Sequence, residues 1–133
     1  MHLLTLDAYS SSDLERLFAA ARHLKRARQA GTPTPPSLAG KRIALLFEKP
    51  SLRTRVSFEV AARELGGDSL YLSPTEVGLG TRESVADVAR VLSAYVDAVV
   101  LRTFHHATAE EFAHYATIPV INGLTDAHHP CQG

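Results

Sequence analysis

Short apolar runs alternate with segments of helical periodicity along this chain of 133 residues, and this alternation is its strongest constraint on the fold. The runs are bounded by turn residues, as buried strands are, and lie at 42–47, 69–72, 98–101 and 118–121. The segments with helical spacing lie at 12–29, 51–65, 83–95 and 108–115. Strands that alternate with helices through short links form parallel sheets with right-handed crossovers. We therefore expect an α/β three-layer sandwich, with a four-stranded parallel sheet flanked by helices.

Capping patterns refine the predicted helices. Ser12 and Glu15 have the spacing of a capping box, so the helix at 12–29 is expected to begin there and to pack through its apolar face. Thr108 and Glu111 repeat this spacing before the short helix that ends at 115. The helix at 51–65 is expected to bury one face, made of Phe58, Ala61, Ala62 and Leu65.

Composition and charge exclude several classes of protein. Fourteen basic and fourteen acidic residues leave no net field, which argues against binding along a nucleic-acid duplex. No run reaches the about 18 apolar residues of a membrane span, and the first residues lack the pattern of a signal peptide. Cys131 is the single cysteine, so the chain can form no internal disulfide. These features predict one soluble domain in the cytoplasm.

The junction between the first strand and the second helix has the features of an anion site. Residues 51–55 open the helix with the sequence Ser-Leu-Arg-Thr-Arg. The first turn of a helix has backbone N–H groups without intrahelical partners and a partial positive charge, so it favours a phosphate. Arg53 and Arg55 add full charge and forked donors. Arg55 is also interpreted as a structural ion-pair former.

Other polar groups follow other predicted strands. Arg102 ends the strand at 98–101, and His128, His129 and Gln132 follow the strand at 118–121. In open α/β sheets, ligands collect beyond the carboxyl ends of the strands. The sequence therefore predicts one site formed by the junction at 51–55, Arg102 and the residues around His129. Asp126 is expected to hold this last loop, and Ser84 to cap the helix at 83–95.

Three other kinds of site are excluded by their missing patterns. Adjacent histidines such as His105 and His106 point away from one another in extended chain, and no His-x-x-x-His or Cys-x-x-Cys is present, so no metal is expected. No Gly-x-Ser-x-Gly marks a nucleophilic serine. The turn after the first strand contains no glycine, which excludes a dinucleotide site there. No cofactor is therefore expected.

Three motifs together resemble the carbamoyl phosphate-binding half of the ornithine carbamoyltransferases, whose nearest relatives are the aspartate enzymes. They are Phe47-x-Lys49-x-Ser51-x-Arg53-Thr54-Arg55, Arg82-Glu83-Ser84-x-x-Asp87-x-Ala89-Arg90-Val91-Leu92 and Asp126-x-x-His129-Pro130-Cys131-Gln132. The resemblance spans essentially the whole chain. It implies a carbamoyl phosphate-binding domain over residues 1–133, acting in arginine biosynthesis.

The resemblance also implies roles for single residues. Phosphate would lie on the hydroxyls of Ser51 and Thr54 and the amides of Leu52 and Arg53, with Arg53 and Arg102 neutralising it as it leaves. His129 would donate to the carbonyl oxygen. Gln132 would orient the carbamoyl nitrogen and complete the binding set. The catalytic residues implied are Arg53, Arg102 and His129.

Two positions depart from the family pattern. Leu52 stands where the family usually has threonine, an exchange that a backbone contact tolerates. Gly78 matches a glutamine that reaches a neighbouring subunit in many members, and Arg82 is the candidate to reach across instead. Members are trimers or multiples of trimers, so a homotrimer is implied for the full-length protein.

The part of the family that binds the amino acid lies beyond the 133 residues of this sequence. L-ornithine would therefore bind through a second domain, and the chain alone is expected to bind carbamoyl phosphate weakly and to turn over poorly. An aspartate carbamoyltransferase-type domain is one alternative. A noncatalytic module that binds phosphate or supports assembly is another.

Overall fold

A computed structural model describes residues 1–132, so the last residue of the 1–133 domain lies outside the described part. Four parallel strands form one sheet in the order β2-β1-β3-β4, which confirms the predicted fold class. The strands are β1 (Arg42–Phe47), β2 (Asp68–Leu72), β3 (Ala98–Arg102) and β4 (Val120–Asn122). The helices are α1 (Ser11–Gln29), α2 (Leu52–Glu64), α3 (Pro74–Val77), α4 (Val85–Tyr95) and α5 (His106–Tyr115).

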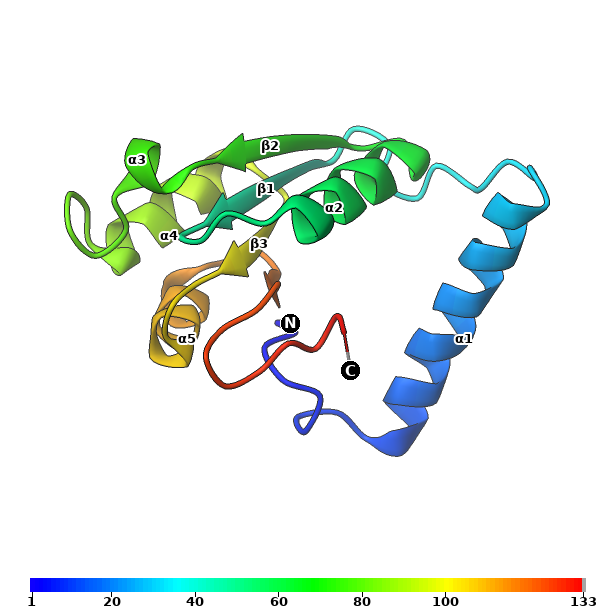
Figure 1. Cartoon of the computed structure of the whole chain (residues 1–133), viewed down its shortest axis with the longest axis horizontal. Coiled ribbons are helices and arrows are strands. Elements are labelled where there is room, and N and C mark those ends of the chain that lie inside the picture. The colour runs from blue at the N-terminus through cyan, green and yellow to red at the C-terminus, as the bar shows by residue number, and fades with distance from the viewer. Residues whose placement is uncertain (133) are drawn as a thin grey trace.

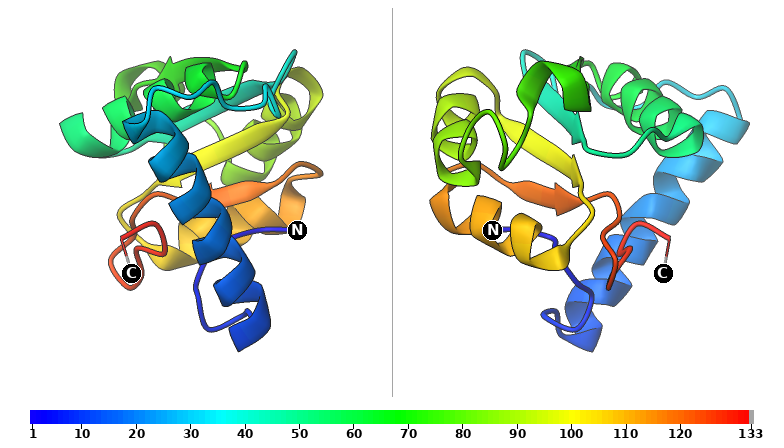
Figure 2. Two further views of the ribbon diagram at one scale, coloured as in Figure 1. Left: turned by 90° about the vertical axis from the view of Figure 1, so that its right-hand side faces the viewer. Right: turned by 60° about the vertical axis from the view of Figure 1, so that its left-hand side comes forward.

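The two faces of the sheet pack against different helices (Figures 1 and 2). Ala44 and Leu46 of β1 belong to a core shared with α4 and α5, and Phe112 of α5 is fully buried there. Leu45 and Phe47 point to the opposite face, where α2 packs. Alternate residues of a strand point to opposite faces, so the continuous apolar run of β1 serves both cores.

Several predicted boundaries were wrong by a few residues. The capping box of α1 pairs Ser10 with Asp13, so this helix begins before the predicted cap. α5 begins at His106 rather than near Thr108. β4 begins two residues later than predicted, because Pro119 has no N–H to donate to the ladder.

α1 does not pack as predicted. None of its residues is buried, and Leu17 and Phe18 are 45% and 40% exposed. Figure 1 shows this helix standing apart from the sheet, joined to it by the proline-rich connector. The apolar stripe identifies the face that can be buried, but it does not identify what covers that face.

α2 also buries less than predicted. Ala62 is buried and Phe58 and Leu65 are half-buried, but Ala61 is exposed. α2 packs mainly on β2 and β1, and α1 meets it at one end, where Arg28 pairs with Glu64 at 2.8 Å. One-sided packing therefore leaves Ala61 in solvent.

The loop predicted at 73–82 contains the single-turn helix α3. Glu76 accepts a hydrogen bond from the backbone N–H of Ser73 at 2.8 Å, which closes this turn. Gly78 ends the turn in the left-handed conformation, at φ 58°, a conformation that glycine adopts without steric cost.

The first residues of the chain lie along β4. Leu3 forms a parallel bridge with Ile121, and the backbone N–H of Leu3 donates to the carbonyl of Val120 at 2.8 Å. The N-terminal segment thus extends the sheet beyond its last strand. None of the helices within residues 1–132 has the length and apolar character needed to cross a membrane.

Candidate functional site

Three strands end side by side at the edge of the sheet where the predicted site lies. Phe47 pairs with Arg102, and Leu101 pairs with Asn122. β1 connects to β2 on one side, and β3 joins β1 on the other, so the strand order reverses between β1 and β3. A crevice at such a reversal is the usual ligand site of an open α/β sheet.

The N-terminus of α2 opens at this reversal. Ser51 is the capping residue, and its hydroxyl accepts a hydrogen bond from the backbone N–H of Thr54 at 3.3 Å. The backbone N–H groups of Leu52 and Arg53 precede the first intrahelical bonds and stay available to a ligand. Leu52 is 79% exposed, so its side chain contributes no core packing. Its backbone is the part that the site can use.

Arg102 extends from β3 toward this helix turn. Its Nη1 donates to the hydroxyl of Thr54 at 3.3 Å. Its Nε is buried and has no hydrogen-bond partner within residues 1–132. Buried polar atoms are nearly always paired in native proteins, so an unpaired donor at a strand end is typical of a binding site.

His129 adds a second buried nitrogen at the same edge. Its Nδ1 has no hydrogen-bond partner in the described part of the chain. Burial lowers the pKa of His129 below its ordinary value, and the positive charge of Arg102 lowers the pKa further. His129 is therefore neutral near pH 7, and one of its ring nitrogens can donate a hydrogen bond.

The loop that carries His129 is held at several points. Asp126 accepts hydrogen bonds from the backbone N–H of His106 at 2.8 Å and from Nδ1 of His105 at 3.3 Å. The backbone N–H of His128 donates to the Thr125 hydroxyl at 3.1 Å. The prediction that Asp126 holds this loop is confirmed.

Two further structural predictions are confirmed. Arg55 forms an ion pair with Glu59 at 2.9 Å, and its guanidinium lies 3.7 Å from the ring centroid of Tyr71. Ser84 caps α4 by accepting a hydrogen bond from the backbone N–H of Asp87 at 3.1 Å. Both residues therefore contribute to the scaffold.

Other predicted site residues are not brought into contact with this cluster. The side chains of Arg53 and Gln132 are exposed and make no hydrogen bond or ion pair with residues 1–132. Arg82 lies against Gly78 within its own loop, where its Nη1 donates to the carbonyl of Thr75 at 3.4 Å. A side chain at Gly78 would approach Arg82 to 2.9 Å, so these two positions are sterically coupled.

Two residues near the site were missed by the sequence reasoning. Glu48 accepts a hydrogen bond from the backbone N–H of Phe104 at 2.8 Å, so it joins the turns after β1 and β3. Asn122 is fully buried and joins the end of β4 to the loop of His129. A polar residue at the end of an apolar strand was the available signal for Asn122.

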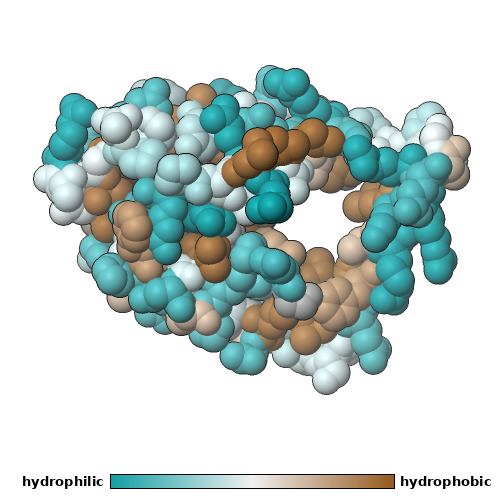
Figure 3. Space-filling model, viewed as in Figure 1, coloured by the Kyte–Doolittle hydropathy of each residue, from teal (hydrophilic) through white to brown (hydrophobic). Residues whose placement is uncertain are grey.

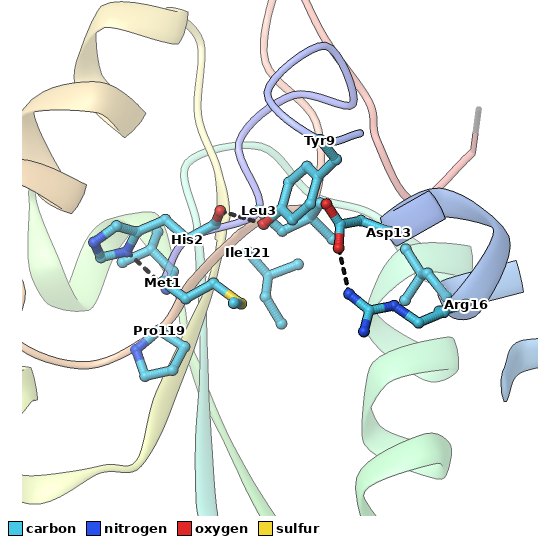
Figure 4. Close-up of a pocket in the computed structure, with 10 residues that line it drawn as sticks. Met1, His2, Leu3, Tyr9, Asp13, Arg16, Pro119 and Ile121 are labelled. Atoms are coloured by element: carbon cyan, nitrogen blue, oxygen red, sulfur yellow. Dashed lines mark hydrogen bonds and ion pairs between the residues drawn. The ribbon is translucent and has the colours of Figure 1, made fainter. Parts of the chain in front are cut away.

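An apolar cavity of about 420 Å³ lies away from this cluster, between α1, the N-terminal segment and β4. Figure 4 shows Met1, Leu3 and Ile121 along one side and the ion pair of Asp13 with Arg16 along the other. Figure 3 shows an opening between α1 and the rest of the molecule, with apolar side chains around its lower part. This cavity contains none of the predicted site residues.

Two histidines make stability sensitive to mild acid. Burial lowers the pKa of both His2 and His129 below 6.5, and Nδ1 of His2 accepts a hydrogen bond from the backbone N–H of Val120. The unfolded chain binds these protons near pH 6.5 while the folded chain does not, so the free energy of unfolding should fall as the pH decreases through 6.5. Carboxylates such as Asp97 and Asp126 have a pKa lowered by hydrogen bonds, so their contributions are lost only below about pH 4.

Urea unfolding at about pH 7.5, 5.5 and 3.5 checks this expectation. The change in stability between the two higher pH values measures the loss due to the histidines, and the change between the two lower values measures the loss due to the carboxylates. Replacing His2 by Asn should reduce the first loss. Equal stability of the unsubstituted chain at the two higher pH values would contradict the expectation.

Comparisons with known proteins identify the family of this chain. The sequence model of the family described as "Aspartate/ornithine carbamoyltransferase, carbamoyl-P binding domain" matches residues 1–133. The chain is 57% identical to an ornithine carbamoyltransferase of Anoxybacillus flavithermus over 129 residues, which are 97% of this chain and 41% of that protein. It is 54% identical to the enzyme of Rhizobium meliloti over 131 residues, covering 98% of this chain and 43% of that protein.

Solved structures give the same assignment. The ornithine carbamoyltransferase of Pyrococcus furiosus has a TM-score of 0.95 and 47% identity, over 98% of this chain and 42% of that chain. A mutant N-acetyl-L-ornithine transcarbamylase, complexed with carbamyl phosphate and N-succinyl-L-norvaline, has a TM-score of 0.88 and 36% identity, over 99% of this chain and 45% of that chain. The chain thus spans about two-fifths of the length of the curated relatives it matches. It belongs to the aspartate/ornithine carbamoyltransferase family and corresponds to the carbamoyl phosphate-binding domain.

Proposed function

We propose that this chain binds carbamoyl phosphate where β1, β3 and β4 end, as part of an ornithine carbamoyltransferase. One observation carries the proposal: Arg102 bonds to Thr54 at the N-terminus of α2 while its buried Nε lacks a partner within residues 1–132. A helix N-terminus, a guanidinium and hydroxyl groups together form a phosphate site.

The phosphate occupies the first turn of α2 in this proposal. Ser51 and Thr54 contribute hydroxyls, and the backbone N–H groups of Leu52 and Arg53 point at the anion. Arg102 supplies charge from β3. Arg53 supplies charge from the helix turn, and its exposed side chain turns inward when the ligand binds.

The carbamoyl group lies toward His129. The neutral imidazole donates a hydrogen bond to the carbonyl oxygen, which gains negative charge when the carbon is attacked. The Gln132 amide carries both donors and an acceptor, so it suits the carbamoyl nitrogen. Donors fixed before the reaction stabilise this charge without reorganising, and one such donor typically contributes about 2.7–4 kcal/mol.

The transfer itself involves the whole protein. The δ-amine of L-ornithine forms a bond to the carbamoyl carbon, the bond from that carbon to the phosphate oxygen breaks, and the amine loses a proton. Arg53, Arg102 and His129 are the catalytic residues in this chain. Ornithine binds to the part of the protein that corresponds to the remaining three-fifths of the relatives.

Ornithine is favoured over aspartate as the acceptor. Three relatives that are 54–57% identical to this chain are ornithine carbamoyltransferases. N-acetyl-L-ornithine transcarbamylase shares the same domain at 36% identity, which indicates that this half supports different acceptors. In this proposal the full protein produces L-citrulline, and this reaction is a step of arginine biosynthesis.

The assembly belongs to the same proposal. The full protein is a homotrimer in which the loop at 73–82 approaches a neighbour's site through Gly78 or Arg82. The exposed apolar residues of α1, including Leu17 and Phe18, are covered by the remainder of the protein. A reducing compartment such as the cytoplasm suits this chain, because its single cysteine, Cys131, is an exposed free thiol.

Isothermal titration of the chain with carbamoyl phosphate and with inorganic phosphate tests the binding proposal. We expect carbamoyl phosphate to bind more tightly by about tenfold, since hydrogen bonds to its carbonyl oxygen and nitrogen add to the phosphate contacts. Equal affinities would instead identify a noncatalytic phosphate-binding module. Citrulline formation at ordinary enzyme rates by this chain alone would contradict the assignment of ornithine binding to another part of the protein.

A further inference from the structure

Asn122 is a fully buried polar residue at the end of β4, and its side chain is fully engaged. Its Nδ2 donates to the carbonyl of Leu4 at 2.9 Å and to the carbonyl of His128 at 3.1 Å. Its Oδ1 accepts from the backbone N–H of Leu124 at 2.8 Å. One side chain therefore links the N-terminal segment, the end of the sheet and the loop of His129.

The carbonyl of His128 accepts several hydrogen bonds in that loop. Besides the amide of Asn122, it accepts from the backbone N–H of Thr125 at 3.0 Å and from the Thr125 hydroxyl at 3.3 Å. This carbonyl belongs to the peptide group that joins His128 to His129. Fixing the plane of that peptide also fixes the position of the Cα atom of His129, because the peptide group is planar.

Asn122 also holds the loop on the other side of His129. Its backbone carbonyl accepts a hydrogen bond from the Cys131 thiol at 3.4 Å. The loop is thus tied to one residue both before and after His129 and Pro130. These contacts hold the backbone on both sides of His129 at the end of the sheet.

The turn between Asn122 and this loop has an unusual backbone. Leu124 has φ 133°, a strained region that residues with side chains rarely adopt. The Oδ1 of Asn122 binds the N–H of Leu124, and the carbonyl of Leu124 accepts from the N–H of Thr103 at 3.1 Å. The amide of Asn122 helps to hold a turn that the chain would otherwise relax.

We propose that Asn122 is the positioning residue that places His129 against the carbamoyl group, an inference that rests on the proposed function. Asn122 acts through the peptide between His128 and His129 and does not touch the ligand. An amide suits this position because its Nδ2 donates to two carbonyls while its Oδ1 accepts from one N–H. Aspartate has the same shape but directs an oxygen at both carbonyls.

The test compares the unsubstituted chain with Asn122→Asp, using carbamoyl phosphate and inorganic phosphate as ligands. Asn122→Asp should lower the preference for carbamoyl phosphate over phosphate about tenfold, because the hydrogen bond to the His128 carbonyl, which places His129, becomes a repulsive contact. The charge of the new aspartate acts on the phosphate of both ligands, so it largely cancels in the ratio of the two affinities. A role confined to general stability would not change that ratio.

Ser93→Ala is the matched control. The Ser93 hydroxyl donates to the carbonyl of Ala89 at 2.7 Å and accepts from the N–H of Thr117 at 3.1 Å, so its loss removes two hydrogen bonds ahead of β4. This variant should keep the full preference. An undiminished preference in folded Asn122→Asp would overturn the inference.

A measurement on the unsubstituted chain covers the case in which Asn122→Asp does not fold. The side-chain NH₂ resonances of Asn122 should shift when carbamoyl phosphate binds and should stay in place when phosphate binds, because only the first ligand engages His129. Equal responses to the two ligands would overturn the inference. If the unsubstituted chain itself does not prefer carbamoyl phosphate, the proposed function fails, and this outcome is distinct from failure at Asn122.

Discussion

Replacing Arg102 by methionine is expected to weaken carbamoyl phosphate binding about 100-fold, which corresponds to about 2.7 kcal/mol. Methionine keeps most of the length of the side chain but removes the guanidinium that bonds to Thr54 and carries the unpaired Nε. The phosphate then lacks its charged partner on the β3 side. Isothermal titration of both chains, each first shown to be folded by circular dichroism, measures the change.

Arg55→Met is a control with the same change in net charge. Arg55 lies on the same helix as Thr54 but is engaged by Glu59 and by the ring of Tyr71. Its removal should weaken binding by less than about threefold, through long-range electrostatics that salt screens. Similar losses in the two variants would show that net charge, rather than the position of Arg102, determines the affinity.

The largest expected effect on stability is that of Phe112→Ala. Phe112 is fully buried where α5 packs on the sheet, and truncating a buried phenylalanine typically lowers the free energy of unfolding by about 3–5 kcal/mol. The loss combines the transfer of the ring to water with the cavity left behind. Urea unfolding followed by circular dichroism measures the difference.

Phe104→Ala removes the same side chain at a half-exposed position. Phe104 is 51% exposed, and its ring centroid lies 4.9 Å from Nζ of Lys49. Its loss removes a cation–π contact of about 0.5–1 kcal/mol and creates no buried cavity, so the loss of stability should be near that value. A loss at Phe112 no larger than that at Phe104 would show that α5 is not part of the cooperative core.

Local patterns predicted the elements of the fold well because each pattern reflects a short-range constraint. The apolar runs at 42–47 and 98–101 became β1 and β3 because continuous burial on two faces leaves no room for polar side chains. The predicted start of β4 was wrong, because the effect of Pro119 on the hydrogen-bond ladder depends on which strand lies beside it. α1 was correctly predicted as a helix but wrongly as a packed one.

The sequence by itself determined the four strands, their parallel direction and four of the helices, and it predicted an anion site at the turn of Ser51, because periodicity, capping and strand-end placement are set by neighbouring residues. Only the tertiary structure decided that Arg102 reaches Thr54, that the guanidinium of Arg55 lies over the ring of Tyr71, and that Asn122 holds the loop of His129. These contacts join residues from different helices, strands and loops. Their formation depends on the distances that the packed sheet imposes, which no local pattern records.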